Sequence, residues 1–257
     1  ELDGASVSEI HANLTALPDI TLARRLDENL GLSFMGTTKG GPFDIPGDLA
    51  RSWLNLPNPT GKSNRDVLKP WINGLDIVRR PRSMWIVDFT GMDEAEASNF
   101  SVPFDYVLAT VKPVRDTNAR EVYRKNWWLF SETRPAMIAA LRDKRRYLAT
   151  PRVAKHRVFA WIPEGTIPDR AVIAFARDDD YSFGVLHSRI HEVWSLALGT
   201  SLEDRPRYTP STSFETFPFP EATEEQHQAI ISTAKHLDDV RNHLLNADSS
   251  LTMTKLY

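Results

Sequence analysis

Hydrophobic residues recur with helical spacing directly after Gly184. Apolar positions separated by three and four residues indicate one face of an α-helix, so we predict a helix from Leu186 to Leu198. The positions that follow this spacing are Ile190, Val193, Trp194, Ala197 and Leu198. The next segment, from Gly199 to Ser213, has no hydrophobic period and is rich in Thr, Ser, Pro and Arg. It is therefore predicted to be an exposed loop.

Three phenylalanines follow that loop in a short proline-containing segment. Phe214, Phe217 and Phe219 alternate with Pro218 and Pro220. The prolines exclude a helix or a central strand, because each lacks the backbone N–H that these structures need. We expect an extended aromatic plug that packs back against the preceding helix.

The strongest helix signal lies at the C-terminal end, from Thr223 to Leu245. Thr223 and Gln226 have the spacing of a capping box, and two glutamates occupy the first turn. One apolar stripe contains Ile230, Ala234, Leu237, Arg241 and Leu244. The polar tail from Asn246 is expected to be frayed.

The rest of the chain contains shorter signals for both strands and helices. Predicted strands are 84–89, 106–111, 158–162 and 172–176; predicted helices are 22–30, 46–56, 118–130 and 135–148; predicted loops are 67–76 and 149–157, and 2–14 is a hairpin or a short helix. Together these elements predict an α+β fold, a mixed sheet with flanking helices, followed by the long amphipathic C-terminal helix.

Composition restricts the class of protein. The 257 residues contain 41% hydrophobic and 25% charged residues, which is typical of a globular chain of one or two domains. No run approaches the ~18 apolar residues of a membrane span. Cysteine is absent, which excludes disulfides and thiolate chemistry and suits a cytoplasmic protein. Because the chain starts at Glu1 and not at Met, we expect a fragment of a longer protein.

Charge is distributed unevenly. Residues 112–157 contain thirteen Lys or Arg and four Asp or Glu, a net charge of +9, whereas the remainder carries −12. These cations could decorate solvated helix faces. Alternatively, they form a surface that follows phosphates, as in nucleic-acid-binding proteins.

Two groups of residues suggest metal chemistry. His187 and His191 are one helical turn apart and could chelate a metal, but no third ligand is evident and the pattern is not H-E-x-x-H. Asp178, Asp179 and Asp180 could bind Mg²⁺, but no E-x-K or D-x-K triplet follows them, so a turn is the favoured interpretation. A metal-dependent hydrolase or nuclease therefore remains an alternative. A protein-interaction module that docks through the C-terminal helix is another.

Motifs for cofactor binding or methyl transfer are missing. The glycines between Phe34 and Ile45 fit neither of the usual phosphate-binding patterns. Asn58–Pro59–Thr60 lacks the second proline and the aromatic residue of an amino-methyltransferase motif. We therefore predict no catalytic residue, cofactor site or metal site in this chain.

The segment from Phe183 to Pro220 resembles a known family. Phe183–Ser188, a helix with Trp194, a variable loop with Tyr208 and then Phe214–Pro220 occur in this order. The arrangement is similar to the target recognition domain of bacterial DNA adenine-N6 methyltransferases of the fused restriction–modification type. The similarity extends over about 200 residues; further matching segments are 40–43, 67–77, 82–89, 112–115, 127–128, 134–135 and 150–159.

This resemblance implies a division of the chain and a set of partners. Residues 1–100 would link to a methyltransferase core, 101–220 would form the recognition domain, and 221–257 a spacer helix with its tail. The partners would be double-stranded DNA and the remainder of the methyltransferase chain. The cofactor S-adenosylmethionine would bind to the missing catalytic domain, which would flip the target adenine.

The resemblance and the basic composition together imply DNA-contacting residues. Phosphate contacts are expected from Lys112, Arg115, Arg120, Arg124, Arg145, Arg146, Arg152, Lys155 and Arg157. Contacts to base edges are expected from His187, Ser188, Arg189, His191, Arg205, Arg207 and Tyr208. Arginine forks suit guanine edges, and cations of either type suit phosphate.

Overall fold

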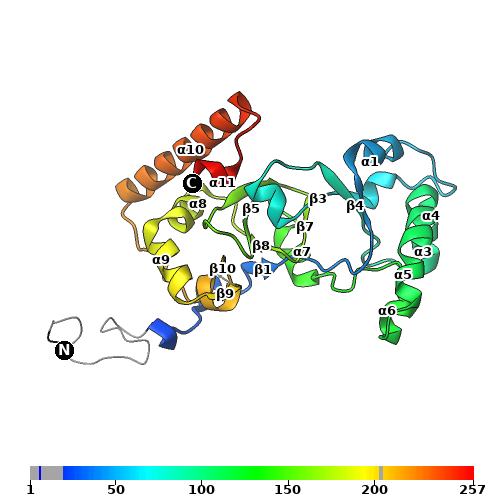
Figure 1. Cartoon of the computed structure of the whole chain (residues 1–257), viewed down its shortest axis with the longest axis horizontal. Coiled ribbons are helices and arrows are strands. Elements are labelled where there is room, and N and C mark those ends of the chain that lie inside the picture. The colour runs from blue at the N-terminus through cyan, green and yellow to red at the C-terminus, as the bar shows by residue number, and fades with distance from the viewer. Residues whose placement is uncertain (1–5, 7–19, 203–204) are drawn as a thin grey trace.

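The computed structural model describes residue 6, residues 20–202 and residues 205–257. They form two lobes that lie side by side along the long axis of the molecule (Figure 1). The segment predicted as a hairpin or short helix, 2–14, lies outside the described residues, apart from residue 6.

The first lobe is built on a mixed sheet in the order β2-β4-β3-β7. Its strands are β2 (Asp44–Pro46), β3 (Leu68–Ile72), β4 (Met84–Val87) and β7 (Ile167–Pro168). β4 pairs antiparallel with both β2 and β3, whereas β7 runs parallel to β3. Because β7 comes from much later in the chain, it ties the two lobes together.

Short helices complete the first lobe (Figure 1). They are α1 (Gly47–Trp53), η3 (Asn64–Asp66), α3 (Glu94–Ser98), α4 (Ser101–Thr110), α5 (Lys112–Asp116) and α6 (Glu121–Lys125). Its core contains Phe43, Phe100, Trp127 and Trp128, so the tryptophan pair is interior. This core includes residues from both sides of the expected division at residue 100.

The second lobe is built on an antiparallel sheet in the order β1-β8-β5-β6. Its strands are β1 (Ser33–Met35), β5 (Arg146–Pro151), β6 (Ala160–Pro163) and β8 (Val172–Phe175). Successive side chains point to opposite faces of a strand, and both faces of this sheet are covered. Leu148 and Phe175 enter one core with Phe183, whereas Tyr147 and Ala174 enter another.

Helices and a hairpin surround this sheet (Figure 1). They are α2 (Gly74–Val78), α7 (Pro135–Leu141), α8 (Asp180–His187), α9 (Arg189–Ala197), β9 (Thr200–Leu202), β10 (Arg205–Arg207), α10 (Glu224–Ala247), α11 (Met253–Leu256) and the single turns η1 (Ile20–Leu22), η2 (Asp27–Asn29) and η4 (Pro210–Phe214). The α+β class, the mixed sheet and the long C-terminal helix are all confirmed. The capping box of Thr223 and Gln226 is also present.

Several local predictions are wrong. The segment 106–111 is not a strand, since most of it belongs to α4, where Val107 and Val111 are one helical turn apart and both buried. The loop predicted at 67–76 contains β3 and the start of α2. The helix predicted at 135–148 ends at Leu141, and the next residues from Arg146 form β5. Of the helix predicted at 118–130, only the five residues of α6 are helical.

The helix predicted at 186–198 buries the face opposite to the one expected. It is interrupted at Ser188, and the apolar positions Ile190 and Val193 of α9 are 75% and 51% exposed. The polar His191 and Ser195 are buried instead. The aromatic plug does pack on this helix as predicted, because the Phe217 ring lies 4.7 Å from the His191 ring.

The tail after Asn246 is anchored, in contrast to the frayed end that was expected. Arg80 Nε donates to the Leu251 carbonyl, and Arg80 Nη2 donates to the Leu245 carbonyl, each at 2.7 Å. Thr254 Oγ1 also donates to the Val78 carbonyl at 3.1 Å. These bonds fasten the end of α10 and α11 to the end of α2.

Candidate nucleic-acid interface

A groove of about 540 Å³ brings together four separate segments of the chain. They are the start of α2, the residues after β5, the residues before β8 and the end of β10. The lining residues are Asn73, Gly74, Leu75, Val78, Arg152, Val153, Arg170, Ala171 and Arg207. Among the described residues of this lining, three are arginines and none is acidic, so the lining carries a net positive charge.

Backbone pairing places the arginines beside one another. Arg152 N–H donates to the Ala171 carbonyl, and Tyr208 N–H donates to the Arg152 carbonyl, both at 2.8 Å. Val153 and Arg207 form an isolated antiparallel bridge. Arg152 is therefore held between the segment that carries Arg170 and the segment that carries Arg207.

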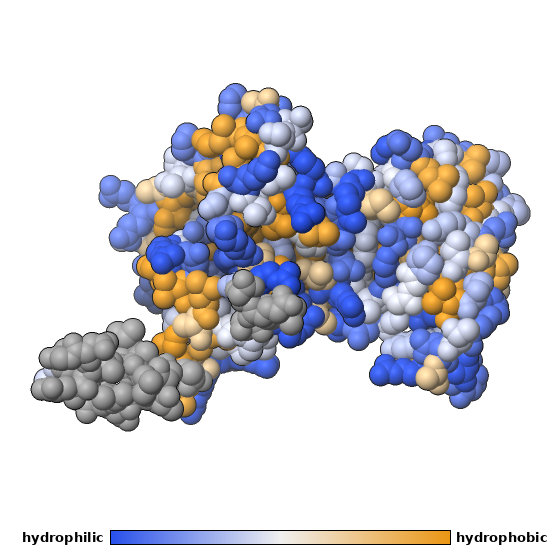
Figure 2. Space-filling model, viewed as in Figure 1, coloured by the Kyte–Doolittle hydropathy of each residue, from blue (hydrophilic) through white to orange (hydrophobic). Residues whose placement is uncertain are grey.

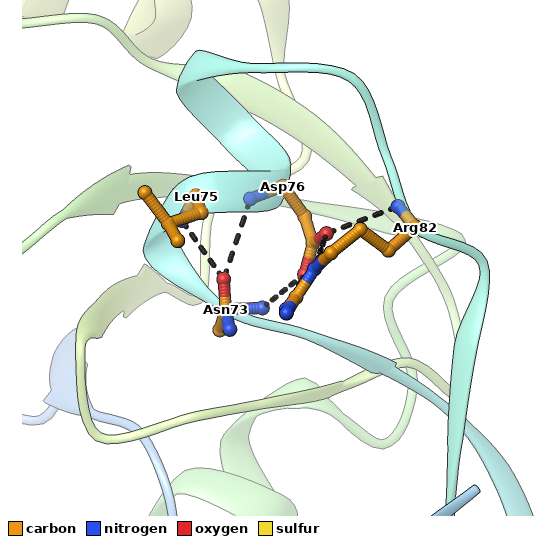
Figure 3. Close-up of polar contacts among 4 residues, drawn as sticks. All are labelled: Asn73, Leu75, Asp76 and Arg82. Carbon is orange, nitrogen blue, oxygen red and sulfur yellow. Dashed lines mark hydrogen bonds and ion pairs between the residues drawn. The ribbon is translucent and has the colours of Figure 1, made fainter. Parts of the chain in front are cut away.

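The α2 wall of the groove is fixed by a capping box and an ion pair (Figure 3). Asn73 Oδ1 accepts from the Leu75 and Asp76 amides, and Asp76 Oδ2 accepts from the Asn73 amide at 2.9 Å. Arg82 donates to both Asp76 oxygens, at 2.9 and 3.0 Å. Burial by itself raises the pKa of Asp76, but the Arg82 and backbone hydrogen bonds outweigh it and lower this pKa below its usual value.

Arg157 is partly buried and is not one of the residues that line the groove. Its Nη1 donates to the Pro151 carbonyl at 2.6 Å and to Thr150 Oγ1 at 3.2 Å, and its Nη2 donates to the Pro206 carbonyl at 3.3 Å. Burial lowers the pKa of Arg157 to about 10, so the guanidinium still carries its charge at neutral pH. The guanidinium also lies 5.0 Å from the centre of the Tyr208 ring.

Tyr208 and His191 continue this buried polar contact toward α9. The His191 ring is fully buried; its Nδ1 lies 2.9 Å from the Leu186 carbonyl and its Nε2 lies 3.1 Å from the Tyr208 hydroxyl. A carbonyl can only accept, so Nδ1 carries the proton and the Tyr208 hydroxyl donates to Nε2. Burial lowers the pKa of His191 to about 4, which keeps the ring neutral.

His187 has a comparable structural role on α8. Its Nε2 accepts from the Phe159 amide at 3.1 Å and from Arg241 Nη2 at 2.8 Å, while its Nδ1 donates to the Phe183 carbonyl at 3.1 Å. Burial and the Arg241 charge lower the pKa of His187 to about 3. Ser188 caps α9 by accepting from the His191 amide, and exposed Arg189 pairs with Glu192.

The other predicted cations are spread over both lobes. In the first lobe Lys112 pairs with Asp116, and Arg115 is only 1% exposed and donates to the Lys39 and Leu129 carbonyls. Arg120 bonds the Tyr123 hydroxyl, and Arg124 bonds the Asn118 carbonyl. In the second lobe Arg145 and Lys155 are exposed, Arg205 is exposed on β10, and Arg146 pairs with Asp180. The basic segment 112–157 is thus divided between the two lobes.

The acidic residues considered as a magnesium site have structural partners. Lys144 pairs with Asp178, Asp179 caps α8 by accepting from Ser182, and Arg146 pairs with Asp180. Within the described part of the chain, no group of three or more His, Asp or Glu side chains is placed to hold a metal ion.

Two polar residues of the groove, Asn73 and Arg170, were not singled out from the sequence as site residues. Arg170 precedes β8 in a turn with no periodic signal, and its closeness to Arg152 depends on the pairing of β5 with β8. Asn73 had a signal, because it lies within a segment, 67–77, that resembles the recognition-domain family.

On the face shown in Figure 2, hydrophilic residues predominate in the middle of the molecule, where the lobes meet.

Comparison with known proteins identifies the family. No helix in the described residues has both the length and the apolar character needed to cross a membrane. No curated protein matches the chain. One solved structure, that of the type IIL restriction–modification enzyme MmeI in complex with DNA, has a similar fold, with a TM-score of 0.75 and 18% identity. The match covers 98% of this chain and 33% of that chain. The model of the MmeI target recognition domain matches residues 60–221, and the chain belongs to this family of DNA target recognition domains of restriction–modification enzymes.

Proposed function

We propose that this chain grips duplex DNA at the groove of Arg152, Arg170 and Arg207 and reads base edges with the adjoining hairpin. The observation that carries the proposal is the convergence of these three arginines from separate parts of the chain. Arginine suits both tasks, because its planar fork binds phosphate oxygens and the guanine edge with two hydrogen bonds. The resemblance in fold to a structure that was solved with DNA supports this assignment.

Most of the sequence-predicted contacts then fall into three groups. Arg152, Lys155, Arg205 and Arg207 lie at or near the groove, and Arg145 is exposed on the same lobe. We propose these as direct contacts. Three cations of the first lobe, exposed Arg120 and the partly exposed Lys112 and Arg124, would contact phosphates farther along the duplex. Five further residues would act by holding the backbone: the buried Arg115, His191 and Tyr208 and the partly buried Arg157 and His187.

We further infer that the chain works within a larger bacterial DNA adenine-N6 methyltransferase of the restriction–modification type. The chain spans about one third of the MmeI chain that it matches, so catalysis would belong to other parts of such an enzyme. S-adenosylmethionine would bind there, and the rest of the enzyme would be the second partner beside DNA. The division at residues 100 and 220 and the cytoplasmic location belong to the same proposal.

Fluorescence anisotropy with a random-sequence duplex at several salt concentrations tests the DNA proposal. Affinity should fall steeply with salt and should not change with EDTA, because counterions are released when arginines contact phosphates. Arg170→Gln should reduce the slope of log K against log salt by roughly 1. The control is Lys125→Gln, which removes an exposed cation that pairs with Glu121 in the first lobe and should leave the slope unchanged.

Absence of binding at low salt would contradict the proposal and favour a protein-interaction module. Binding that disappears with EDTA would favour the metal-dependent alternative. Equal effects of the two variants would show that the groove is not the site of contact.

A further inference from the structure

A single partly buried guanidinium contacts two of the three segments that carry groove arginines. Arg157 donates to the carbonyl of Pro151, which immediately precedes Arg152, and to the carbonyl of Pro206, which immediately precedes Arg207. The two segments also bond directly, since Ala154 N–H donates to the Pro206 carbonyl at 3.3 Å. These bonds fix the backbones of Arg152 and Arg207 relative to each other.

We infer that Arg157, supported by Tyr208 and His191, is a positioning unit that sets how well the groove arginines discriminate between bases. The inference rests on the proposed DNA function. It assigns to these three residues, none of which lines the groove, a role in specificity without any contact to DNA.

The chemistry of Arg157 suits this task. Its planar fork presents several N–H donors at fixed angles, and here they reach three acceptors on two segments. Lysine would keep the charge but offers a single flexible ammonium, which cannot reproduce this spacing. A bidentate contact to a base needs placement to within about 0.5 Å, whereas a phosphate contact tolerates much looser placement.

Tyr208 and His191 hold the end of β10 that carries Arg207. The Tyr208 backbone bonds to Arg152, its hydroxyl donates to His191 Nε2, and the neutral His191 ring bonds to the end of α8. The His191 ring is itself held at 4.7 Å from Phe217 of the aromatic plug. The hairpin arm that ends in Arg207 is thus fastened to α8, α9 and the plug.

The test compares Arg157→Lys with Arg115→Lys. Arg115 is the matched control, because it is also buried and also donates to two backbone carbonyls, but in the first lobe. A target duplex is first selected with the unaltered protein from a random pool. Anisotropy then gives Kd for target and random duplexes, with thermal unfolding measured in parallel.

Arg157→Lys should lower the ratio of target to random affinity by at least about tenfold, the effect of one mismatched base pair. The random-duplex Kd and its salt slope should stay within about twofold. Arg115→Lys should leave the ratio unchanged even where it lowers the melting temperature. If Arg157→Lys weakens both duplexes equally, or matches Arg115→Lys, the residue is merely structural and the inference fails.

Tyr208→Phe keeps the test decisive if Arg157→Lys does not fold. It removes only the hydroxyl that bonds His191, and it should lower the ratio by about threefold with unchanged random binding. An unchanged ratio would overturn the inference. If the unaltered protein binds no duplex, the proposed DNA function itself has failed, and that outcome is visible before any variant is measured.

Discussion

Arg115 in the first lobe and Arg157 in the second have the same local chemistry but different surroundings. Both come from the basic segment 112–157, and both donate to backbone carbonyls inside the protein. Arg115 joins the loop at Lys39 to Leu129, within the first lobe. Arg157 joins two of the three segments that carry groove arginines, namely those of Arg152 and Arg207. The comparison shows that the role of a buried arginine depends on what its acceptors are attached to.

The exposed cations of the two lobes differ in a related way. Lys112 and Lys125 pair with a carboxylate one turn away on their own helices, and such exposed pairs contribute little to stability. Arg152, Arg170 and Arg207 instead converge on one groove. The net charge of +9 in residues 112–157 therefore overstates the number of unpaired cations that the first lobe offers to DNA. It understates the number in the second lobe, because Arg170 and Arg207 come from outside that segment.

The largest expected effect tests whether the two buried arginines are equivalent for stability. Arg115→Met and Arg157→Met each leave buried carbonyls without donors, and each should lower the free energy of unfolding by on the order of 4 kcal/mol. Urea denaturation measures both. The two arginines would not be equivalent if one variant lost less than about 1 kcal/mol of unfolding free energy, because the carbonyls freed in that variant would then have found other donors.

A fall in pH should destabilise the second lobe more than the first, and this effect should be smaller than that of the substitutions at Arg115 and Arg157. The pKa values of His187 and His191 are lowered to about 3 and about 4, whereas unfolded histidine has a pKa near 6.5. Between pH 6.5 and 4 the unfolded chain binds protons that the folded chain does not, so stability falls as pH falls. The loss should be roughly 1.5 kcal/mol for each histidine at pH 5.5.

Hydrogen exchange at pH 7.5 and pH 5.5, corrected for the intrinsic rate, locates this effect. The described first-lobe elements, from β2 to α6, contain no histidine, so the extra loss of protection should be confined to the second lobe. His191→Gln should remove about half of the pH dependence. Equal loss of protection in both lobes would show that the two lobes unfold as one unit.

The smallest expected effect concerns close helix packing, which distinguishes the second lobe. A Cβ on Gly184 of α8 would lie 2.7 Å from Ile230 Cγ2 and 3.2 Å from the Ala234 Cβ of α10. Gly184→Ala should therefore lower the free energy of unfolding by about 1 kcal/mol, because overpacking outweighs the better helix propensity of alanine.

Ile230→Leu removes the methyl group that Gly184→Ala would meet. In a double-mutant cycle followed by urea denaturation, the pair should be more stable than the sum of the single changes predicts, by about 0.5 kcal/mol or more. Additive effects would mean that α10 moves away from α8 without cost.

Much of the fold was predictable because it depends on local signals. The capping box at Thr223, the strand from Met84 and the aromatic plug around Phe217 are each specified by neighbouring residues. The errors occur where two local readings compete. Val107 and Val111 suit a strand by composition, yet packing between α4 and the first core selects a helix. On α9 the apolar positions were correctly recognised as periodic, but the buried face is the one with His191.

The candidate site was predictable only in part. The sequence singled out Arg152, Arg207 and the basic region around them, since cations near a recognition-domain segment suit DNA. It did not separate Arg157 from Arg152, although one is an interior clamp and the other lines the groove. The hydrogen bonds of Arg157 to the Pro151 and Pro206 carbonyls decide this difference, and they follow from pairing between distant segments, which leaves no mark on the local sequence.

The sequence by itself determined the α+β class, the long terminal helix and the family, because capping, periodicity and an ordered set of family segments are local properties. Only the tertiary structure decided which cations meet. Arg152, Arg170 and Arg207 become neighbours through the β5–β8 pairing and the bridge from Val153 to Arg207. Tertiary contacts also engage His187, His191 and Arg157 in hydrogen bonds inside the protein, so these residues, which resemble DNA contacts in the sequence, support the backbone.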